Sequence, residues 1–264
     1  MMDNPEAHDL ARRYLAGVDA RAQHESFAEL TTDASLDAAY AVQDAYHRLL
    51  RERGHEVAGY KVALTSRAMQ EFCGVDEPLA GAVFDNVVHP SPATVRLEGH
   101  RHLGVEFEVA VRMEADLTSG AGPHTRDSVA AAVGACHPSF ELVEDRNADY
   151  SSLNAFDLVA ENAWNAGVVL ADAVTDWRSV DMVDGVTRLT LNGEPAGEGR
   201  TGDALGHPLE AVAFLANNLN ARGQSLRAGQ FVMTGSSIVT QFPSPGDELV
   251  FTVDGLGDVH LSCR

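Results

Sequence analysis

The chain has 264 residues, of which 45% are hydrophobic, and its formal net charge is −20 at pH 7. This composition excludes a disordered chain, and no stretch approaches the roughly 20 apolar residues of a membrane span. The strong negative charge excludes a nucleic-acid partner, because phosphate contacts need clustered lysine and arginine.

The basic residues are 18 arginines and one lysine, Lys61, which lies in the apolar segment Tyr-Lys-Val-Ala-Leu. The cysteines, Cys73, Cys136 and Cys263, are far apart and lack metal-binding spacing, so we expect core thiols. Residues 1–8 are acidic and lack the basic start and apolar core of a signal peptide, which predicts a cytoplasmic protein.

The first part of the chain is predicted to be mainly helical. Asn4 and Pro5 form a helix start, with Gly17 as its stop, and apolar residues recur at helical spacing between residues 35 and 53. A short strand follows at residues 60–64, and then a short helix begins after Ser66 and closes at Gly74. We predict a smaller helical N-terminal region over residues 1–75.

From residue 76 the pattern changes to short strands separated by Gly, Pro and Asp. Helices are predicted from Thr125 through Val133 and from Pro208 to Arg222, and Asn192-Gly193 is a hairpin signal. The predicted strands lie at residues 81–84, 94–97, 104–113, 140–143, 167–170, 189–191, 231–234, 249–253 and 259–261. The fold class is therefore α+β, with a β-rich mixed-sheet domain over residues 76–264.

The segment 104–113 has the period-two pattern of a strand. Its apolar residues face one way, and Glu106 and Glu108 face the other. Two neighbouring carboxylates raise each other's pKa, so they need either water or a divalent cation. A solvated strand face and a metal site both explain the pair.

Glu141 favours the metal site. It lies within the apolar run Phe-Glu-Leu-Val, which predicts a buried strand, and a buried carboxylate is rare unless it is paired or bound to metal. Three carboxylates without nearby nitrogen or sulfur ligands suit a hard cation, Mg²⁺ or Mn²⁺.

Eight motifs then occur in the order and with the gaps of one family. The chain resembles the 2-keto-4-pentenoate hydratase / 4-oxalocrotonate decarboxylase family of the fumarylacetoacetate hydrolase superfamily, from about residue 40 to the C-terminus. The motifs begin at residues 59 (GYKVALTS), 74 (GVDEP), 105 (VEFEVA), 140 (FELVEDR), 160 (AENA), 205 (LGHPL), 233 (MTG) and 245 (PGD).

The resemblance implies a mixed β-roll or barrel-like body, usually assembled into homo-oligomers, with Mg²⁺ or Mn²⁺ on Glu106, Glu108 and Glu141. It implies a small anionic 2-oxo or 2-hydroxydienoic acid as substrate, chelated to the metal. Proton transfers and addition of water would then give a 4-hydroxy-2-oxo acid. Lys61 would lie in this active site, as a base or as an anchor for the substrate carboxylate; a structural lysine is the third alternative.

Further candidates follow from the same resemblance. Glu161, followed by Asn162, could orient the lysine or a metal-bound water, or could simply cap a structural element. Asp157 is a candidate partner of Lys61. Arg146 could meet the far end of a dicarboxylate, or form a salt bridge at the rim.

The turn Thr234-Gly235-Ser236 follows an apolar strand. Its backbone N–H groups and hydroxyls could hold a substrate carboxylate, or it could be an ordinary Gly/Ser turn.

Two departures from the family leave the reaction open. Many hydratases have an aspartate shortly after the proline of the GVDxP motif, where this chain has Leu79-Ala80-Gly81, and Trp164 replaces a small polar residue. A hydratase of 2-hydroxy-2,4-dienoates is predicted first. The alternatives are a 4-oxalocrotonate-type decarboxylase, an acylpyruvate-type carbon–carbon hydrolase, and a non-catalytic partner subunit.

Overall fold

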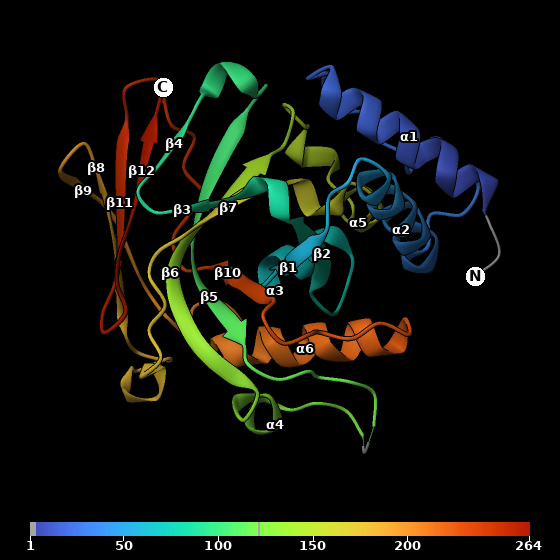
Figure 1. The fold of residues 1–264 in the computed structure, drawn as a ribbon. Coiled ribbons are helices and arrows are strands. Elements are labelled where there is room, and N and C mark those ends of the chain that lie inside the picture. Colours follow the sequence, from blue (N-terminus) through green and yellow to red (C-terminus); the bar gives the residue numbers. More distant parts are fainter. Residues whose placement is uncertain (1–3, 121) are drawn as a thin grey trace.

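The structure is a computed structural model that describes residues 4–120 and 122–264 (Figure 1). The first three residues, part of the segment predicted to carry no signal peptide, lie outside the described residues. The helices are α1 (Pro5–Asp19), α2 (Leu36–Glu52), α3 (Arg67–Cys73), α4 (Arg126–Ala130), α5 (Ala155–Ala160) and α6 (Pro208–Ala221). The strands are β1 (Val57–Ala63), β2 (Leu79–Phe84), β3 (Val88–Pro90), β4 (Ala93–Val95), β5 (Leu103–Met113), β6 (Val133–Glu144), β7 (Asn165–Leu170), β8 (Val186–Leu191), β9 (Glu194–Arg200), β10 (Phe231–Ser236), β11 (Glu248–Val253) and β12 (Gly257–Cys263).

The long helices begin where the sequence predicts. Asn4 caps α1 by accepting from the N–H groups of Glu6 and Ala7, and α1 ends at Asp19, slightly beyond Gly17. Ser35 caps α2 through the N–H of Ala38. Side-chain caps at Asn4 and Ser35 therefore mark where both helices begin.

The prediction that the helix after Thr125 reaches Val133 is wrong. Helix α4 ends at Ala130, and Val133 begins β6, where it pairs with Met113 of β5 and is buried. Val129 and Val133 are four residues apart, which imitates one helix face, but the β-branched Val133 serves the long strand pairing instead.

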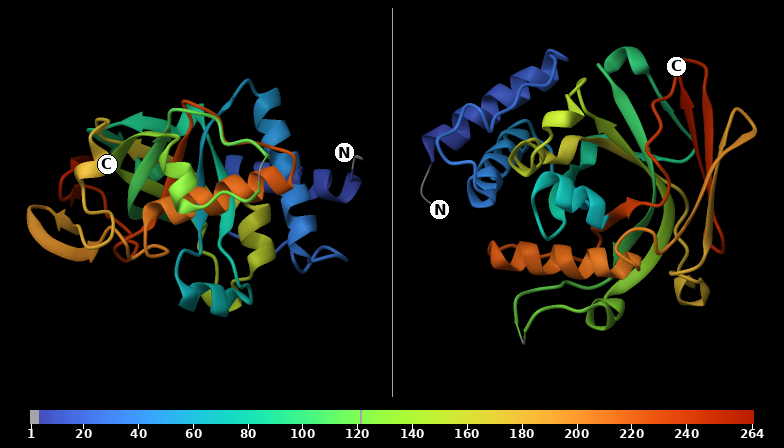
Figure 2. Two further views of the ribbon diagram at one scale, coloured as in Figure 1. Left: turned by 90° about the horizontal axis from the view of Figure 1, so that it is seen from below. Right: turned by 180° about the vertical axis from the view of Figure 1, so that it is seen from behind.

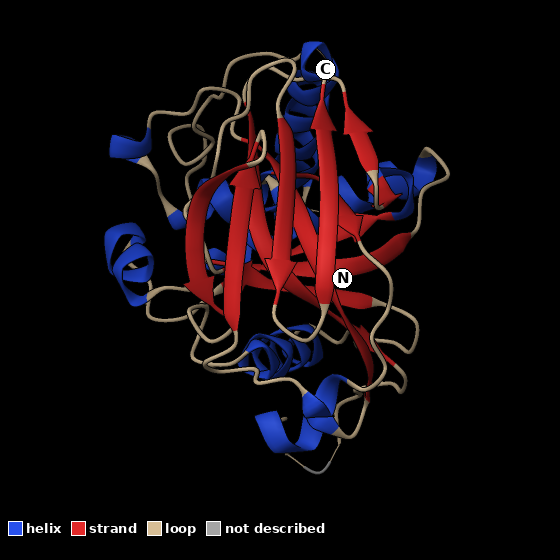
Figure 3. Ribbon diagram, turned by 90° about the vertical axis from the view of Figure 1, so that its left-hand side faces the viewer, coloured by secondary structure: helices blue, strands red, loops and turns tan. Residues whose placement is uncertain are grey.

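Two sheets form the body of the protein. The larger has the strand order β2-β1-β10-β5-β6-β7-β3, and the smaller has the order β4-β12-β11-β8-β9. The long curved strands β5 and β6 separate the smaller sheet on one side from the helices on the other (Figures 1 and 2). Figure 3 shows the smaller sheet in front of the larger one. The α+β fold with a curled mixed sheet is confirmed.

The core between the sheets is aromatic. Phe107 of β5, Phe140 of β6 and Phe251 of β11 are fully buried, with ring centroids 5.7 to 6.3 Å apart. Because side chains alternate along a strand, the neighbours Glu106 and Glu141 point to the opposite, helix-covered face. The pattern that builds the core thus also builds the site.

The N-terminal helices pack on that other face. Tyr14 of α1 stacks edge-on against Tyr46 of α2 at 4.8 Å, and its hydroxyl donates to the carbonyl of Glu161. Strand β1 hydrogen-bonds to both β2 and β10, so the proposed boundary at residue 75 does not interrupt the larger sheet. Among the described residues, no helix has the length and apolarity needed to cross a membrane.

Candidate metal centre and active-site cavity

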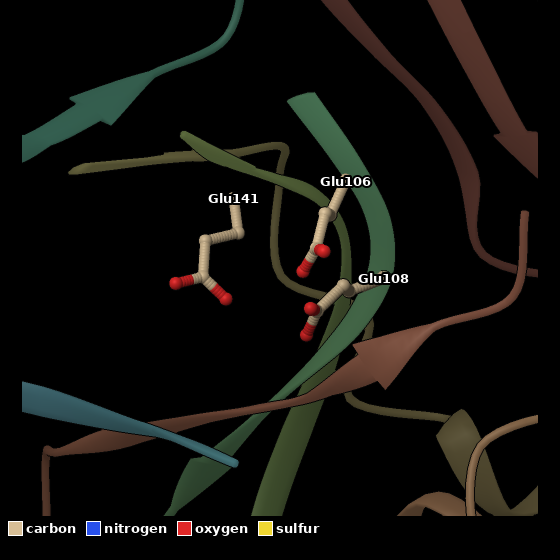
Figure 4. A group of neighbouring side chains, drawn as sticks. All are labelled: Glu106, Glu108 and Glu141. Atoms are coloured by element: carbon tan, nitrogen blue, oxygen red, sulfur yellow. The ribbon is translucent and has the colours of Figure 1, made fainter. Parts of the chain in front are cut away.

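Glu106, Glu108 and Glu141 come together on the helix-covered face of β5 and β6. Glu106 lies directly opposite Glu141 in the strand pairing, and Glu108 is two residues further along β5. One oxygen from each carboxylate lies within 4.8 Å of the others (Figure 4). The pairing register therefore brings together the three carboxylates that the sequence predicts as a metal site.

Each carboxylate has one oxygen held by the protein. Thr240 Oγ1 donates to Glu106 at 3.0 Å, the Gly235 N–H donates to Glu108 at 2.8 Å, and Asn165 Nδ2 donates to Glu141 at 2.9 Å. The second oxygens of Glu108 and Glu141 are buried without a hydrogen-bond partner. Buried polar atoms are almost always satisfied, so these free oxygens fit a bound cation.

The donor set selects the kind of cation. The cluster offers carboxylate oxygens only, which suits Mg²⁺ or Mn²⁺ better than zinc or copper. The residues present therefore fit a hard divalent metal ion.

Lys61 enters this cluster from β1. Its Nζ lies 3.2 Å from Glu141 Oε1 and donates to the Ala163 carbonyl at 3.2 Å, and its side chain is buried. Burial opposes the charge on the ammonium, but Glu141, Glu106 and Glu108 together raise the pKa of Lys61 above its ordinary value. Lys61 is therefore protonated beside the three carboxylates.

The pKa values of the buried carboxylates Glu108 and Glu141 are also raised. Burial, followed by the charges of the neighbouring glutamates, raises the pKa of Glu108 well above its ordinary value. Burial raises the pKa of Glu141 to about 7, although Lys61 opposes the shift. With all groups ionised, three negative charges face one positive charge, leaving −2, which one divalent cation neutralises.

A bulge in β10 directs the backbone N–H of Gly235 toward Glu108 of the cluster. The pairing with β5 shifts between Met233 and Ser236, and Gly235 there adopts a φ of 105°. A Cβ at Gly235 would lie 2.4 Å from Thr65 Oγ1. Glycine is therefore required for the backbone N–H to reach Glu108.

A strained turn positions the Ala163 carbonyl. Asn162, Ala163 and Trp164 are consecutive non-glycine residues with φ values of 54°, 47° and 57°. Left-handed backbone costs such residues about 1–2 kcal/mol each, so the surroundings must hold the turn in place.

Side chains supply that support. Asn162 accepts from the Ala82 N–H and donates to the Ala82 carbonyl, both at 2.8 Å. His47 of α2 contacts Asn162 Oδ1 at 2.9 Å, and burial lowers the pKa of His47 to about 4. A neutral His47 thus donates to a turn that holds Lys61.

A cavity of about 350 Å³ opens onto the cluster. Lys61, Glu106, Gly235 and Ser236 line its metal-side end. The remaining walls are mostly apolar or aromatic and include Val143, Leu153, Leu158, Trp164, Met69 and Phe242. The volume suits a small organic acid.

Glu161 is held away from Lys61. Its Oε2 lies 2.9 Å from Arg146 Nη2 and accepts from Trp164 Nε1 at 2.7 Å. Burial raises its pKa to about 7. In the described part of the chain, no hydrogen bond or ion pair joins Glu161 to Lys61, so Glu161 supports the wall behind Trp164.

Arg146 is not a rim residue. Its side chain is buried, stacks over the Tyr14 ring at 5.1 Å and faces a separate cavity of about 260 Å³ beneath α1. The predicted contact with a distal substrate carboxylate does not fit this position, because the guanidinium is directed to Glu161 instead.

The predicted pairing of Asp157 with Lys61 is wrong. Asp157 Oδ1 accepts from the N–H groups of Phe27 and Ala28, both at 2.8 Å, and Oδ2 accepts from Asn154. Oδ1 thus attaches the loop after α1 to α5, Oδ2 is used by the residue that caps α5, and among the described residues no hydrogen bond or ion pair links Asp157 to Lys61.

The turn at residues 234–236 is mostly engaged within the protein. Thr234 is buried and its hydroxyl donates to the Val109 carbonyl at 2.7 Å, while the Gly235 N–H is used by Glu108. Ser236 lines the cavity, although its hydroxyl donates to Ile238 at 2.7 Å. The groups of Thr234 and Gly235 predicted to hold a substrate carboxylate are therefore engaged within the protein, as is the Ser236 hydroxyl, which also accepts from the Phe107 N–H at 2.9 Å. A role of this turn in substrate binding stays a prediction.

Sequence reasoning missed Asn165 and His47. Asn165 follows the turn and fixes a metal-side carboxylate, and nothing in its local sequence signals this. His47 could have been found, because Gln43 and His47 are polar residues four apart on the buried face of α2. Gln43 donates to the Ala80 and Val159 carbonyls.

Comparison with known proteins agrees with this geometry. A family model described as fumarylacetoacetate (FAA) hydrolase C-terminal matches residues 39–262. The chain belongs to this family.

Among the relatives, a 2-hydroxyhexa-2,4-dienoate hydratase from Comamonas testosteroni is 34% identical, covering 83% of this chain and 85% of the relative. A 4-oxalocrotonate decarboxylase from Pseudomonas putida is also 34% identical, covering 84% and 83%. A solved 4-oxalocrotonate decarboxylase from Pseudomonas putida G7, complexed with magnesium and adipate, superposes with a TM-score of 0.93 at 28% identity, covering 100% and 99%. The predicted family and a lyase type of enzyme are confirmed.

Proposed function

We propose that the protein is a divalent-metal-dependent hydratase that adds water to a 2-hydroxy-2,4-dienoate and yields a 4-hydroxy-2-oxo acid. The observation that carries this proposal is the convergence of Glu106, Glu108 and Glu141, with two buried free oxygens, beside the protonated Lys61. Relatives named hydratases at 33–34% identity support the reaction type.

Glu106, Glu108 and Glu141 would hold Mg²⁺ or Mn²⁺. Bound there, the ion supplies Lewis-acid stabilisation of negative charge on the C2 oxygen of a 2-oxo acid.

Lys61 contributes a positioned cation. Two of its three N–H donors are directed to Glu141 and Ala163, which leaves one donor for the anionic end of the substrate. The hydrogen bond to the carbonyl of Ala163, in the strained turn, restricts where the Lys61 ammonium can move.

The apolar walls of the cavity would surround the conjugated chain of the substrate. Walls such as Leu158 and Trp164 are buried and exclude bulk water from the conjugated chain. A water molecule that enters there is the nucleophile for the distal carbon, and proton transfers along the chain shift the double bond.

A decarboxylase of a 4-oxalocrotonate-type acid is the second candidate. Leu79-Ala80-Gly81 favours it, because many hydratases have an aspartate in this stretch, whereas here the buried Leu79 lies on the same face of the sheet as Lys61. The decarboxylase relatives support the same reading. Both candidates use one metal and one 2-oxo acid.

The deciding experiment follows both products. Freshly generated 2-hydroxypenta-2,4-dienoate and 4-oxalocrotonate would each be incubated with Mg²⁺, Mn²⁺ or a chelator and monitored by ultraviolet absorbance and mass detection. Metal-dependent gain of water on the dienoate supports the hydratase. Metal-dependent loss of CO₂ from 4-oxalocrotonate, without hydration of the dienoate, replaces it with the second candidate.

We further propose that the chain assembles into a homo-oligomer and works in the cytoplasm, as its family resemblance suggests. Light scattering of the purified protein tests the assembly, and a monomer at micromolar concentration contradicts it.

A further inference from the structure

The cavity beneath α1, here called the α1 cavity, is separate from the one that opens onto the metal cluster. Its volume is about 260 Å³, and the two cavities have no lining residue in common. Its buried lining residues include the aromatic side chains Tyr14, Tyr46 and Phe84. Walls of this kind fit a flat ring, and the volume fits a small molecule.

Arg146 is the buried cationic residue of the α1 cavity. It is 3% exposed, and its Nε has no hydrogen-bond partner among the described residues. Its Nη2 faces Glu161 at 2.9 Å, and its guanidinium lies over the Tyr14 ring at 5.1 Å. Buried polar atoms are almost always satisfied, so an open N–H of a guanidinium requires an acceptor oxygen.

The local backbone accommodates this arginine against its own preferences. Gly17 lies in α1, and a Cβ there would lie 2.9 Å from Arg146 Nη1, so a side chain at residue 17 would displace the guanidinium. Arg146 itself has a φ of 52°, in the left-handed region that non-glycine residues disfavour. Backbone strain of this kind concentrates at ligand sites, where the surrounding structure maintains it.

The charges around the α1 cavity favour an anion. Three arginines line it together with two carboxylates: Arg21, Arg53, Arg146, Asp19 and Glu144. Arg53 pairs with Asp19 at 2.6 Å, and Glu144 accepts from three backbone N–H groups. In the described part of the chain, Arg21 has no carboxylate partner and donates to a backbone carbonyl. The uncompensated charge is therefore positive.

The turn at residues 162–165 connects the α1 cavity to the metal centre. Residues 162 and 165 line the α1 cavity, whereas residues 163 and 164 line the other one. Asn165 donates to Glu141 Oε1 at 2.9 Å, and Lys61 lies 3.2 Å from the same oxygen. A ligand that fixes Asn165 therefore acts on a carboxylate of the metal cluster.

We infer that the α1 cavity is a binding site for a small monocarboxylic acid with a single ring, and that its occupancy tightens metal binding at the glutamate cluster through Asn165. The carboxylate would accept from Arg146 and face Arg21, and the ring would lie against the aromatic walls. The inference goes beyond the proposed reaction and does not depend on its substrate. Because coupling between two sites is reciprocal, Mg²⁺ must strengthen binding of the acid by the same factor.

Benzoate is the probe, and calorimetry on the unmodified protein in chelator measures its binding without metal. We expect a Kd at or below about 1 mM, an ordinary affinity for a ligand of this size. Benzamidine has the same ring and the opposite charge, and it should bind at least tenfold more weakly. No binding of benzoate, or equal binding of benzamidine, overturns the inference.

Filling the α1 cavity tests the location. Val18→Trp adds an indole from the half-buried side of α1 and should abolish benzoate binding. Ala16→Trp is the matched control, because Ala16 lies on the same helix, is exposed and does not line the cavity. Circular dichroism verifies the fold of both variants. Unchanged benzoate binding in a folded Val18→Trp variant contradicts the proposed location.

Removal of the uncompensated charge is an independent test with less risk to the fold. Arg21→Ala should weaken benzoate binding about tenfold. Arg12→Ala removes an equal charge from an exposed arginine of α1 that does not line the cavity, and it should leave benzoate binding unchanged. Equal losses in the two variants would show long-range attraction only and would contradict a carboxylate site at Arg21.

Magnesium titrations test the coupling. Saturating benzoate should raise Mg²⁺ affinity about fivefold, because a fixed Asn165 orients Glu141 better. The increase should be absent in Val18→Trp, which excludes benzoate bound to the metal itself, and in Asn165→Ala, which should still bind benzoate. An unchanged or lower Mg²⁺ affinity in the unmodified protein overturns the coupling.

Discussion

Glu141 and Glu161 are two buried carboxylates that differ in what surrounds them. Burial raises the pKa of each to about 7. Glu141 lies beside Lys61, whereas Glu161 lies beside Arg146 and, at 3.5 Å, beside His24, whose pKa is lowered by burial. Glu161 therefore has a directly paired cation, Arg146, and no second carboxylate within its ion pair. Around Glu141 two more glutamates leave an excess of −2. The uncompensated charge, rather than burial or a shifted pKa, distinguishes the metal site from the structural pair.

Removing one charge from the acidic cluster should produce the largest functional effect. We expect Glu141→Gln to lower Mg²⁺ affinity and kcat/KM by more than about 100-fold, beyond the loss seen for outer partners of a metal ligand. In chelator, the same variant should be at least as stable as the parent, because the charge falls from −2 to −1. Calorimetric titration with Mg²⁺ and denaturant unfolding measure the two effects. A variant that binds Mg²⁺ normally would remove Glu141 from the metal site.

The same kind of change at the second carboxylate should affect stability instead. Glu161→Leu leaves Arg146 buried and unpaired, so we expect the free energy of unfolding to fall by about 3 kcal/mol. Replacing both partners, with Arg146→Met and Glu161→Leu together, should recover most of this loss. Denaturant unfolding of the single and double variants measures it. A double variant no more stable than the single one would argue against the ion pair as the cause.

Asn165 tests how much the cluster depends on its protein partners. Asn165→Ala removes the donor to Glu141, and we expect Mg²⁺ affinity to fall about 10- to 100-fold, as for other residues that orient metal ligands. Asn154→Ala is a matched control, because Asn154 donates to Asp157, outside the cluster. The control should leave Mg²⁺ affinity unchanged, and equal losses in both variants would indicate a general loss of structure.

The pH dependence of the metal-free protein should have the same sign in both regions, because burial raises the pKa of Glu141 and of Glu161 to about 7. The folded pKa of Glu141, about 7, lies above its unfolded value, so the metal-free folded state binds the extra proton. Its contribution to stability is therefore present at low pH and is lost as pH rises from about 4.5 to about 7, by up to about 1.4 kcal/mol per pH unit.

Metal should reverse this trend. Mg²⁺ requires ionised carboxylates, so its affinity should rise up to about tenfold per pH unit below pH 7 for each proton released. Titrations at pH 6, 7 and 8 measure the slope, which should persist in the Glu161→Leu variant. A slope of zero in the parent protein would mean that the cluster binds metal without releasing protons.

The sequence by itself determined most of the strands, the starts of the long helices and the identity of the acidic residues, but not β3, β9 or the first part of β6. Alternation placed Glu106 and Glu108 on one face of β5, and Glu141 within an apolar strand, because side-chain direction follows from the local period of two. Capping residues predicted α1 and α2 for the same reason, since a cap acts within a few residues. The family resemblance added Lys61.

Only the tertiary structure decided which partners surround the other candidate residues. Glu161, Asp157 and Arg146 carry the same local signals as the metal-side residues, yet their partners are Trp164, the loop after α1 and one another. These contacts join segments more than a hundred residues apart in some cases, as between Asp157 and Phe27. The net charge around a buried carboxylate depends on all charged groups near it in space, and the local sequence does not show which groups these are.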